Sequence, residues 1–186
     1  VLTNKLQNPK FVLDIIKQDA NNEKNLLDGV EFKLEKLVKN AGETQWVVST
    51  TYKFSNNQNY LTGTTGTDGK IIENPFTNLE PGRYRLTETK AHPGYNLLSK
   101  SIDIEFTQDG KCYIDDSKNP ETNKTFEPGA NNTYTMHLTV LNRKTPELPH
   151  TGADAPSLWL LIGLPLAVAG LLIFTFRYNR KGGRRH

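Results

Sequence analysis

Three side chains with useful chemistry stand at the ends of apolar rows in this 186-residue sequence. A β-strand sends alternate side chains to the same face. The segments FVLDIIK, YRLTE and MHLTVLN are apolar at every second position until the last, which is Lys17, Glu88 or Asn142. An amine, a carboxyl and a carboxamide are groups used in nucleophilic attack and proton transfer. Because burying them is costly without a partner, we expect the three row ends to meet in the interior.

A simpler interpretation uses the same three residues. Lys17 could extend its stem along apolar surface and keep its amine in water, and Asn142 could cap a turn. Glu88 could form an ordinary buried ion pair with Lys17. The spacing alone leaves the reactive and the structural interpretation open.

Strands must position these residues. Runs of period two, broken by turn residues every ten or so positions, extend from Lys10 to Asn142 and predict an all-β sandwich. The predicted strands are Phe11–Lys17, Val30–Leu37, Trp46–Phe54, Ile71–Leu79, Gly82–Ala91, Tyr95–Ser99, Ser101–Thr107, Lys111–Ile114 and Tyr134–Asn142. The polar stretches Asn56–Asn59 and Asp115–Asn132 are predicted loops.

The C-terminal segment has a different composition. Residues 157–176 contain no charged side chain, and as a helix they would span about 30 Å, the thickness of a bilayer core. The tail at 177–186 carries five Lys and Arg side chains, which places it in the cytoplasm and the preceding residues outside. The sequence therefore predicts a transmembrane helix followed by a basic cytoplasmic tail.

Charge and cysteine content exclude several functions. Residues 1–151 hold 18 basic and 19 acidic side chains, so the body lacks the basic surface of a nucleic-acid-binding protein. Cys112 is the only cysteine, which rules out a disulfide within the chain and a multi-cysteine metal site. We expect no metal and no cofactor. The start at Val1, without a signal peptide, suggests a part of a longer or processed protein.

The pentapeptide LPHTG precedes the apolar span. Together with that span and the basic tail it resembles the cell-wall sorting signal of Gram-positive surface proteins. This resemblance implies recognition by a sortase, a membrane-bound transpeptidase, and cleavage between Thr151 and Gly152. Thr151 would then be transferred to an amine of peptidoglycan or of another pilin subunit, and membrane retention through 157–176 would be transient. The recognised residues would be Leu148, Pro149, His150, Thr151 and Gly152, with His150 at the variable position.

The body also resembles a known domain. FVLDIIKQD with LLDGVEFKLEKL, TDGKIIENPFTNLEPGRYRLTETKAHPGY and LTVLNRK are similar to the collagen-adhesin B-type (Cna B) domain of Gram-positive pilins and adhesin stalks, an immunoglobulin-like, prealbumin-like β-sandwich. YRLTETKAHPGY resembles the pilin E-box YxLxETxAPxGY, except that His92 stands between the alanine and the proline. In such domains a lysine on the first strand bonds to an asparagine or an aspartate on the last, assisted by the E-box glutamate. The matching residues are Lys17, Asn142 and Glu88.

The chemistry implied for these residues is plausible in a dry interior. Burial lowers the pKa of a lysine and raises that of a glutamic acid. An unprotonated Lys17 could attack the Asn142 side-chain carbonyl while Glu88 polarises it and moves protons to the departing ammonia. The expected product is an intramolecular isopeptide bond that forms once. The chain is therefore not expected to be an enzyme with turnover.

The sequence as a whole predicts five parts. They are a linker at 1–9, the Cna B-type sandwich at 10–144, a linker with the sorting motif at 145–156, the membrane helix at 157–176 and the tail at 177–186. The leading hypothesis is a structural stalk or base module of a pilus subunit or wall-anchored protein at the cell surface.

Two other functions are alternatives to this hypothesis. The first is an adhesin domain that binds host matrix through the excursion Trp46–Thr67 and its aromatic residues, which are Trp46, Tyr52, Phe54 and Tyr60. The second is a surface hydrolase that uses Cys112 with His92 or His137. No motif supports this pairing, and a lone strand cysteine is usually inert.

Overall fold

The computed structural model describes residues 8–114 and 122–146. Contacts divide the chain into two units, Val1–Thr145 and Pro146–His186. The described part contains no helix that is long and apolar enough to cross a membrane. The sorting motif at 148–152, the expected membrane helix at 157–176 and the basic tail lie outside the described residues.

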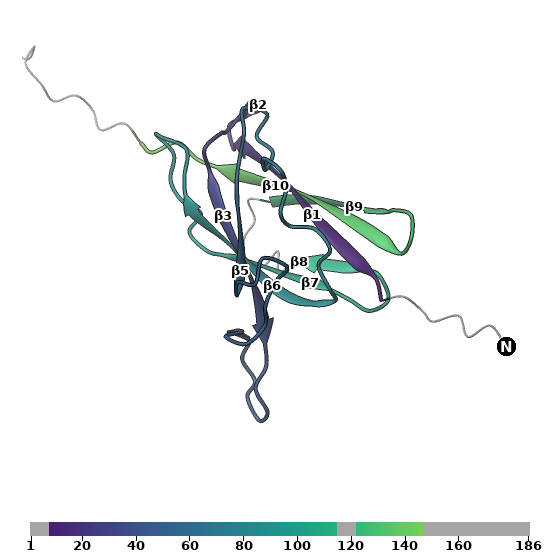
Figure 1. Ribbon diagram of the computed structural model, residues 1–186. Coiled ribbons are helices and arrows are strands. Elements are labelled where there is room, and N and C mark those ends of the chain that lie inside the picture. The colour runs from purple at the N-terminus through teal and green to yellow at the C-terminus, as the bar shows by residue number, and fades with distance from the viewer. Residues whose placement is uncertain (1–7, 115–121, 147–186) are drawn as a thin grey trace, which may run out of the picture. The chain divides into compact units, whose positions relative to one another are not determined.

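The described strands form two sheets, which confirms the predicted all-β sandwich (Figure 1). One sheet has the order β2-β1-β10-β9, and the other has the order β4-β3-β6-β7-β8, with β5 also paired to β3. The strands are β1 Lys10–Asp19, β2 Asn22–Leu26, β3 Glu31–Val38, β4 Val47–Val48, β5 Tyr60–Thr64, β6 Gly82–Lys90, β7 Ile102–Phe106, β8 Cys112–Ile114, β9 Thr122–Pro128 and β10 Thr133–Asn142.

The first and last strands of the sandwich are neighbours. β1 and β10 run parallel, with Lys17 opposite Val140 and Asp19 opposite Asn142. All the other strand pairs described are antiparallel. Because β1 and β10 are parallel, their C-terminal ends lie at the same end of the sheet, which brings Lys17 and Asn142 to one place.

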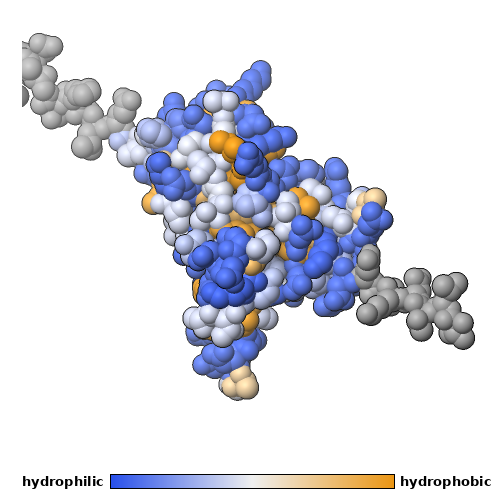
Figure 2. Space-filling model, viewed as in Figure 1, coloured by the Kyte–Doolittle hydropathy of each residue, from blue (hydrophilic) through white to orange (hydrophobic). Residues whose placement is uncertain are grey.

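The core lies between the two sheets and follows the predicted alternation. Every second residue of β1 is buried, and the inward rows of β6 and β10 are buried in the same way. Phe11 of β1 stacks on Phe106 of β7 across the core, with ring centroids 4.5 Å apart. Figure 2 shows polar side chains over most of the visible face and apolar ones in small separate spots. Burial of the apolar rows is the main force that holds the sheets together.

Six predicted strands agree with β1, β3, β6, β7, β8 and β10 to within two residues at each end. Three observed strands were missed. β2 and β5 have mostly exposed side chains, so they lack a full apolar row. β9 falls within the stretch predicted as a loop at Asp115–Asn132, and that prediction is wrong over Thr122–Pro128. β9 pairs with β10 along seven residues, so this ladder forms it although its sequence is polar.

Three predicted strands are largely wrong. Within Trp46–Phe54 only Val47–Val48 finds a partner strand, and Tyr95–Ser99 makes only an isolated bridge. Within Ile71–Leu79 the backbone has positive φ at Glu73 and Asn78, which interrupts an extended strand. The buried residues there are Ile71, Phe76 and Leu79, whose spacing is not the period of a strand.

Candidate functional site

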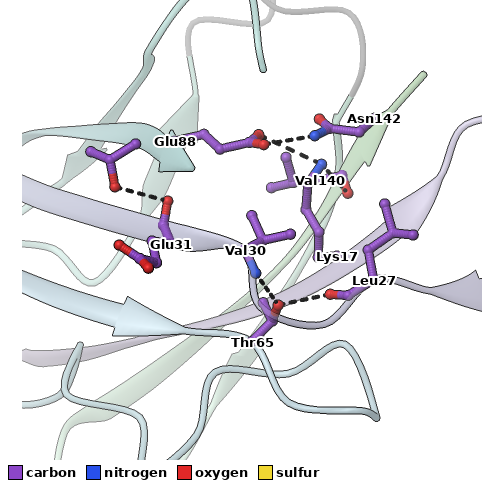
Figure 3. A network of polar contacts seen from close by, with 9 residues as sticks. Lys17, Leu27, Val30, Glu31, Thr65, Glu88, Val140 and Asn142 are labelled. Carbon is purple, nitrogen blue, oxygen red and sulfur yellow. Dashed lines mark hydrogen bonds and ion pairs between the residues drawn. The ribbon is translucent and has the colours of Figure 1, made fainter. Parts of the chain in front are cut away.

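Glu88 contacts both of the other predicted site residues (Figure 3). The Asn142 amide Nδ2 donates a hydrogen bond of 2.6 Å to Glu88 Oε1. The Lys17 Nζ lies 3.8 Å from Glu88 Oε2 and donates to the backbone carbonyl of Val140 at 3.2 Å. The three row ends therefore meet, as the alternation of each strand predicted.

The three side chains come from both sheets. Lys17 and Asn142 extend inward from β1 and β10 at the common end of the parallel pair. Glu88 extends inward from β6 in the facing sheet, where it is paired with Phe32 of β3. The cluster thus closes one end of the core and joins the two sheets.

The site is dry. The exposed fraction is 0% for Lys17, 6% for Glu88 and 1% for Asn142. Two acceptor atoms, Glu88 Oε2 and Asn142 Oδ1, have no hydrogen-bond donor among the described residues. A buried acceptor without a donor costs about 1–3 kcal/mol. The noncovalent arrangement of the three side chains is therefore incompletely satisfied.

Burial raises the pKa of the Glu88 carboxyl above its ordinary value. The charge of Lys17 and the hydrogen bond from the Asn142 amide offset only part of this rise. The protonated acid is therefore more accessible at Glu88 than in water. A carboxyl whose pKa is raised by burial, and which contacts both an amine and a carboxamide, is suited to general acid–base chemistry.

Asp19 is a buried residue of the site that the sequence interpretation missed. It is 3% exposed and lies two positions after Lys17 on the same inward row. Its carboxylate accepts hydrogen bonds of 2.8 Å from the Asn21 backbone N–H and from the Tyr95 hydroxyl. Extending the period-two row by one step would have found Asp19. The Tyr95 contact had no signal in the sequence, because it joins distant segments.

His92, which lies between Ala91 and Pro93 where the E-box pattern has alanine directly before proline, anchors the loop after β6. Its Nδ1 lies 2.9 Å from the carbonyl oxygen of Asp28 and 3.0 Å from its Oδ1. The His92 ring meets the Tyr95 ring edge to face, with centroids 5.5 Å apart. This departure from the E-box pattern is thus accompanied by a contact with the turn between β2 and β3.

The cysteine and histidines of the hydrolase hypothesis do not meet in the described part of the chain. Cys112 contacts the Met136 sulfur at 2.9 Å, and burial raises the pKa of its thiol to about 12. His137 pairs with Asp14 across β1 and β10. A thiol that stays protonated at neutral pH is a poor nucleophile. The residues described also contain no cluster of three side chains suited to a metal.

The aromatic residues of the proposed adhesive excursion divide into two groups. Phe54 is buried, and Tyr52 packs against it edge to face with centroids 5.0 Å apart. Trp46 and Tyr60 are 36% and 41% exposed. Two of the four side chains therefore pack in or against the core, and the adhesin hypothesis rests on the other two.

A match to a known protein family identifies the family of this chain. The family described as SpaA, a prealbumin-like fold domain, matches residues 12–120, more than half of the chain. The chain belongs to this family. The resemblance to Cna B-type and SpaA-like pilin domains is thereby confirmed. The matched range contains Lys17 and Glu88 and ends before β10, so Asn142 is placed by the fold and by the sequence pattern.

Several solved structures are similar to this SpaA-family chain. The C-terminal fragment of the pilus adhesin SpaC from Lactobacillus rhamnosus GG is 25% identical with a TM-score of 0.50, and the match covers 76% of this chain and 48% of that one. The group B streptococcus pilus 2b backbone protein is 27% identical with a TM-score of 0.44, covering 76% and 43%. BcpA, the major pilin subunit of Bacillus cereus, is 20% identical with a TM-score of 0.41, covering 74% and 31%.

The chain thus spans less than half the length of each of these proteins. No curated protein matches the sequence.

Proposed function

We propose that this chain is a structural subunit of a Gram-positive pilus or a related surface protein, and that its SpaA-family domain is cross-linked by an isopeptide bond between Lys17 and Asn142. The observation that carries the proposal is the contact of one buried carboxyl, Glu88, with both partners. The family match and the similarity to a pilus adhesin fragment support the structural role.

The reaction balances within the three side chains. Transfer of one proton from Lys17 to Glu88 gives a neutral amine and a neutral acid, a pair that burial favours. The Lys17 nitrogen then attacks Cγ of Asn142, the new C–N bond forms and the bond from Cγ to Nδ2 breaks. Glu88 gives its proton to Nδ2, which leaves as ammonia, and then accepts the proton that the Lys17 nitrogen loses on becoming an amide N–H. Because the fold holds the groups together, effective molarities on the order of 10⁵ M are available.

The parallel arrangement of β1 and β10 gives the bond a mechanical role. Tension that enters at the start of β1 and leaves after β10 would pass from Lys17 directly to Asn142. The chain between these residues, including every antiparallel ladder of the second sheet, would then carry no load. The loop-entropy relation used for disulfides gives about 5 kcal/mol of added stability for a loop of this length.

Anchoring would use the C-terminal residues. We infer a folded domain at 10–144, a linker at 145–156, a membrane helix at 157–176 and a cytoplasmic tail at 177–186. A sortase would act on Leu148–Gly152, and Thr151 would become the point of attachment to peptidoglycan or another pilin subunit. The proposed location is the cell surface. The support for this step is the order of motif, apolar span and basic tail.

Intact-mass measurement of the full chain tests the cross-link. The wild type is expected to lack the mass of one ammonia, and proteolysis is expected to release a branched peptide that joins the β1 and β10 segments. Glu88→Ala and Lys17→Ala should each restore the full mass. Lys10→Ala, a change of a partly exposed lysine on the same strand, should leave the deficit in place. A wild-type chain of full mass would refute the cross-link.

A further inference from the structure

The reactive groups depend on the spacing between two sheets. Lys17 and Asn142 are held in register by the β1–β10 ladder. Glu88 belongs to the other sheet, and ladder hydrogen bonds do not fix its distance from them. Because a small misplacement of a catalytic group slows a reaction strongly, an additional connection between the sheets is needed at this end.

The loop after β6 provides that connection through its backbone. Tyr95 lies seven residues after Glu88 and forms an isolated antiparallel bridge with Lys144. The Asn96 N–H donates to the Arg143 carbonyl at 3.0 Å, and the Thr145 N–H donates to the Gly94 carbonyl at 2.9 Å. The loop that continues from Glu88 is therefore hydrogen-bonded to the segment that directly follows Asn142.

The Tyr95 side chain connects the same loop to β1. Its hydroxyl donates a hydrogen bond of 2.8 Å to Asp19 Oδ2, and the Asn25 amide donates to the Tyr95 hydroxyl at 2.8 Å. Asp19 follows Lys17 by two residues and lies opposite Asn142 in the ladder. Tyr95, on the loop that follows Glu88, is thus linked both to β1 and to the segment directly after β10.

The protonation states of Tyr95 and Asp19 strengthen the hydrogen bond between them. The Asn21 backbone N–H holds the pKa of Asp19 below its ordinary value, and burial followed by the hydrogen bond to Asp19 raises the pKa of Tyr95. At neutral pH the phenol keeps its proton and the carboxylate stays ionised. Hydrogen bonds to an ionised acceptor are about twice as strong as those between neutral groups.

We propose that Tyr95 and Asp19 position Glu88 for the cross-linking reaction by clamping the loop after β6 to the C-terminal end of β1. Both act through the placement of Glu88 and are positioning residues. This inference rests on the proposed isopeptide function and assigns a role in it to two residues outside the reactive trio.

The test follows the rate of ammonia loss. The full chain is made in a short pulse of cell-free synthesis, and intact mass is recorded over time for the wild type, Tyr95→Phe and Asp19→Asn. Tyr95→Phe removes only the hydroxyl, and Tyr113→Phe on the exposed surface of β8 is its matched control. We expect each clamp variant to react about tenfold more slowly, because each removes a hydrogen bond to a charged group. The control should react at the wild-type rate.

Two further measurements separate positioning from a loss of folding. The double variant Tyr95→Phe/Asp19→Asn should be no slower than the slower single variant, since one change removes the donor and the other the acceptor's charge of the same hydrogen bond. In a Lys17→Met background, which cannot cross-link, Tyr95→Phe should remain folded by circular dichroism at the reaction temperature.

The proposed clamp would be refuted by any of the following results. Wild-type rates for Tyr95→Phe, or a slowing that only follows the loss of folded protein, would refute it while leaving the cross-link intact. A wild-type chain that never loses ammonia would refute the proposed function, and the clamp with it.

Discussion

Strand β6 carries a charged side chain on each of its two faces. The one on the outer face has a complete set of hydrogen bonds to its partner, and the one on the inner face does not. On the outer face, Arg85 holds Asp103 of β7 with two hydrogen bonds of 2.8 and 3.0 Å. On the inner face, Glu88 lies 3.8 Å from Lys17 and leaves Oε2 without a donor among the described residues. The outer pair is a complete bidentate ion pair in which Arg85 is partly exposed and Asp103 is buried.

The difference indicates what each pair is for. A buried ion pair is stable only when its remaining hydrogen-bonding atoms are satisfied. The inner cluster does not meet this condition, and an amide bond between Lys17 and Asn142 would remove the buried amine altogether. We therefore interpret the inner cluster as the arrangement that precedes a reaction and the outer pair as a final structure.

The largest effect is expected from Glu88→Gln, which keeps the size of the side chain and removes its acid. Without the cross-link, the free energy of unfolding should fall by about 5 kcal/mol relative to the wild type. Denaturant titration of both proteins measures this loss. If Glu88→Gln were as stable as the wild type, the inner cluster, like the outer ion pair, would be only structural.

Gly69→Ala should disturb the position of Lys17. An added Cβ at Gly69 would lie 2.7 Å from the Lys17 carbonyl oxygen, and the glycine has φ of +69°. We expect a loss of about 2 kcal/mol together with slower ammonia loss, because the backbone of β1 must shift. Gly42→Ala has a similar φ without any close atom, so it should cost less and leave the reaction rate unchanged.

The buried acid of Glu88 should also affect how the stability of a chain that cannot cross-link depends on pH. In Lys17→Met the folded-state pKa of Glu88 remains raised by burial, so the folded state favours the protonated acid. The stability that the protonated Glu88 contributes is complete below its unfolded-state pKa and is lost as pH rises through its folded-state pKa.

Denaturant titration from acid to neutral pH should therefore show the Lys17→Met chain losing stability relative to Lys17→Met/Glu88→Gln, which lacks this titration. Parallel stability curves for the two variants would contradict the burial of an ionisable acid at this position.

The smallest effect is expected at the outer pair. Asp103→Asn should lower the free energy of unfolding by about 1 kcal/mol or less, because the Arg85 side chain is 34% exposed and water can solvate its charge. The deficit of one ammonia should be unchanged in its intact mass. A loss of the cross-link in Asp103→Asn would show that the two faces of β6 are coupled.

The sequence by itself determined the local patterns of this protein. The inward rows that end at Lys17, Glu88 and Asn142 were visible because side-chain direction alternates along any single strand, whatever its neighbours. For the same reason the apolar strands β1, β6 and β10 were placed to within two residues. Family membership followed from segments that are continuous in sequence.

Only the tertiary structure decided which strands pair and what surrounds the trio. Polar β9 is a strand because it pairs with β10, and Ile71–Leu79 is irregular because its buried residues must reach the core at uneven spacing. The hydrogen bond from Tyr95 to Asp19 joins residues 76 positions apart. Such contacts depend on the packing of one sheet against the other, and no local period encodes them.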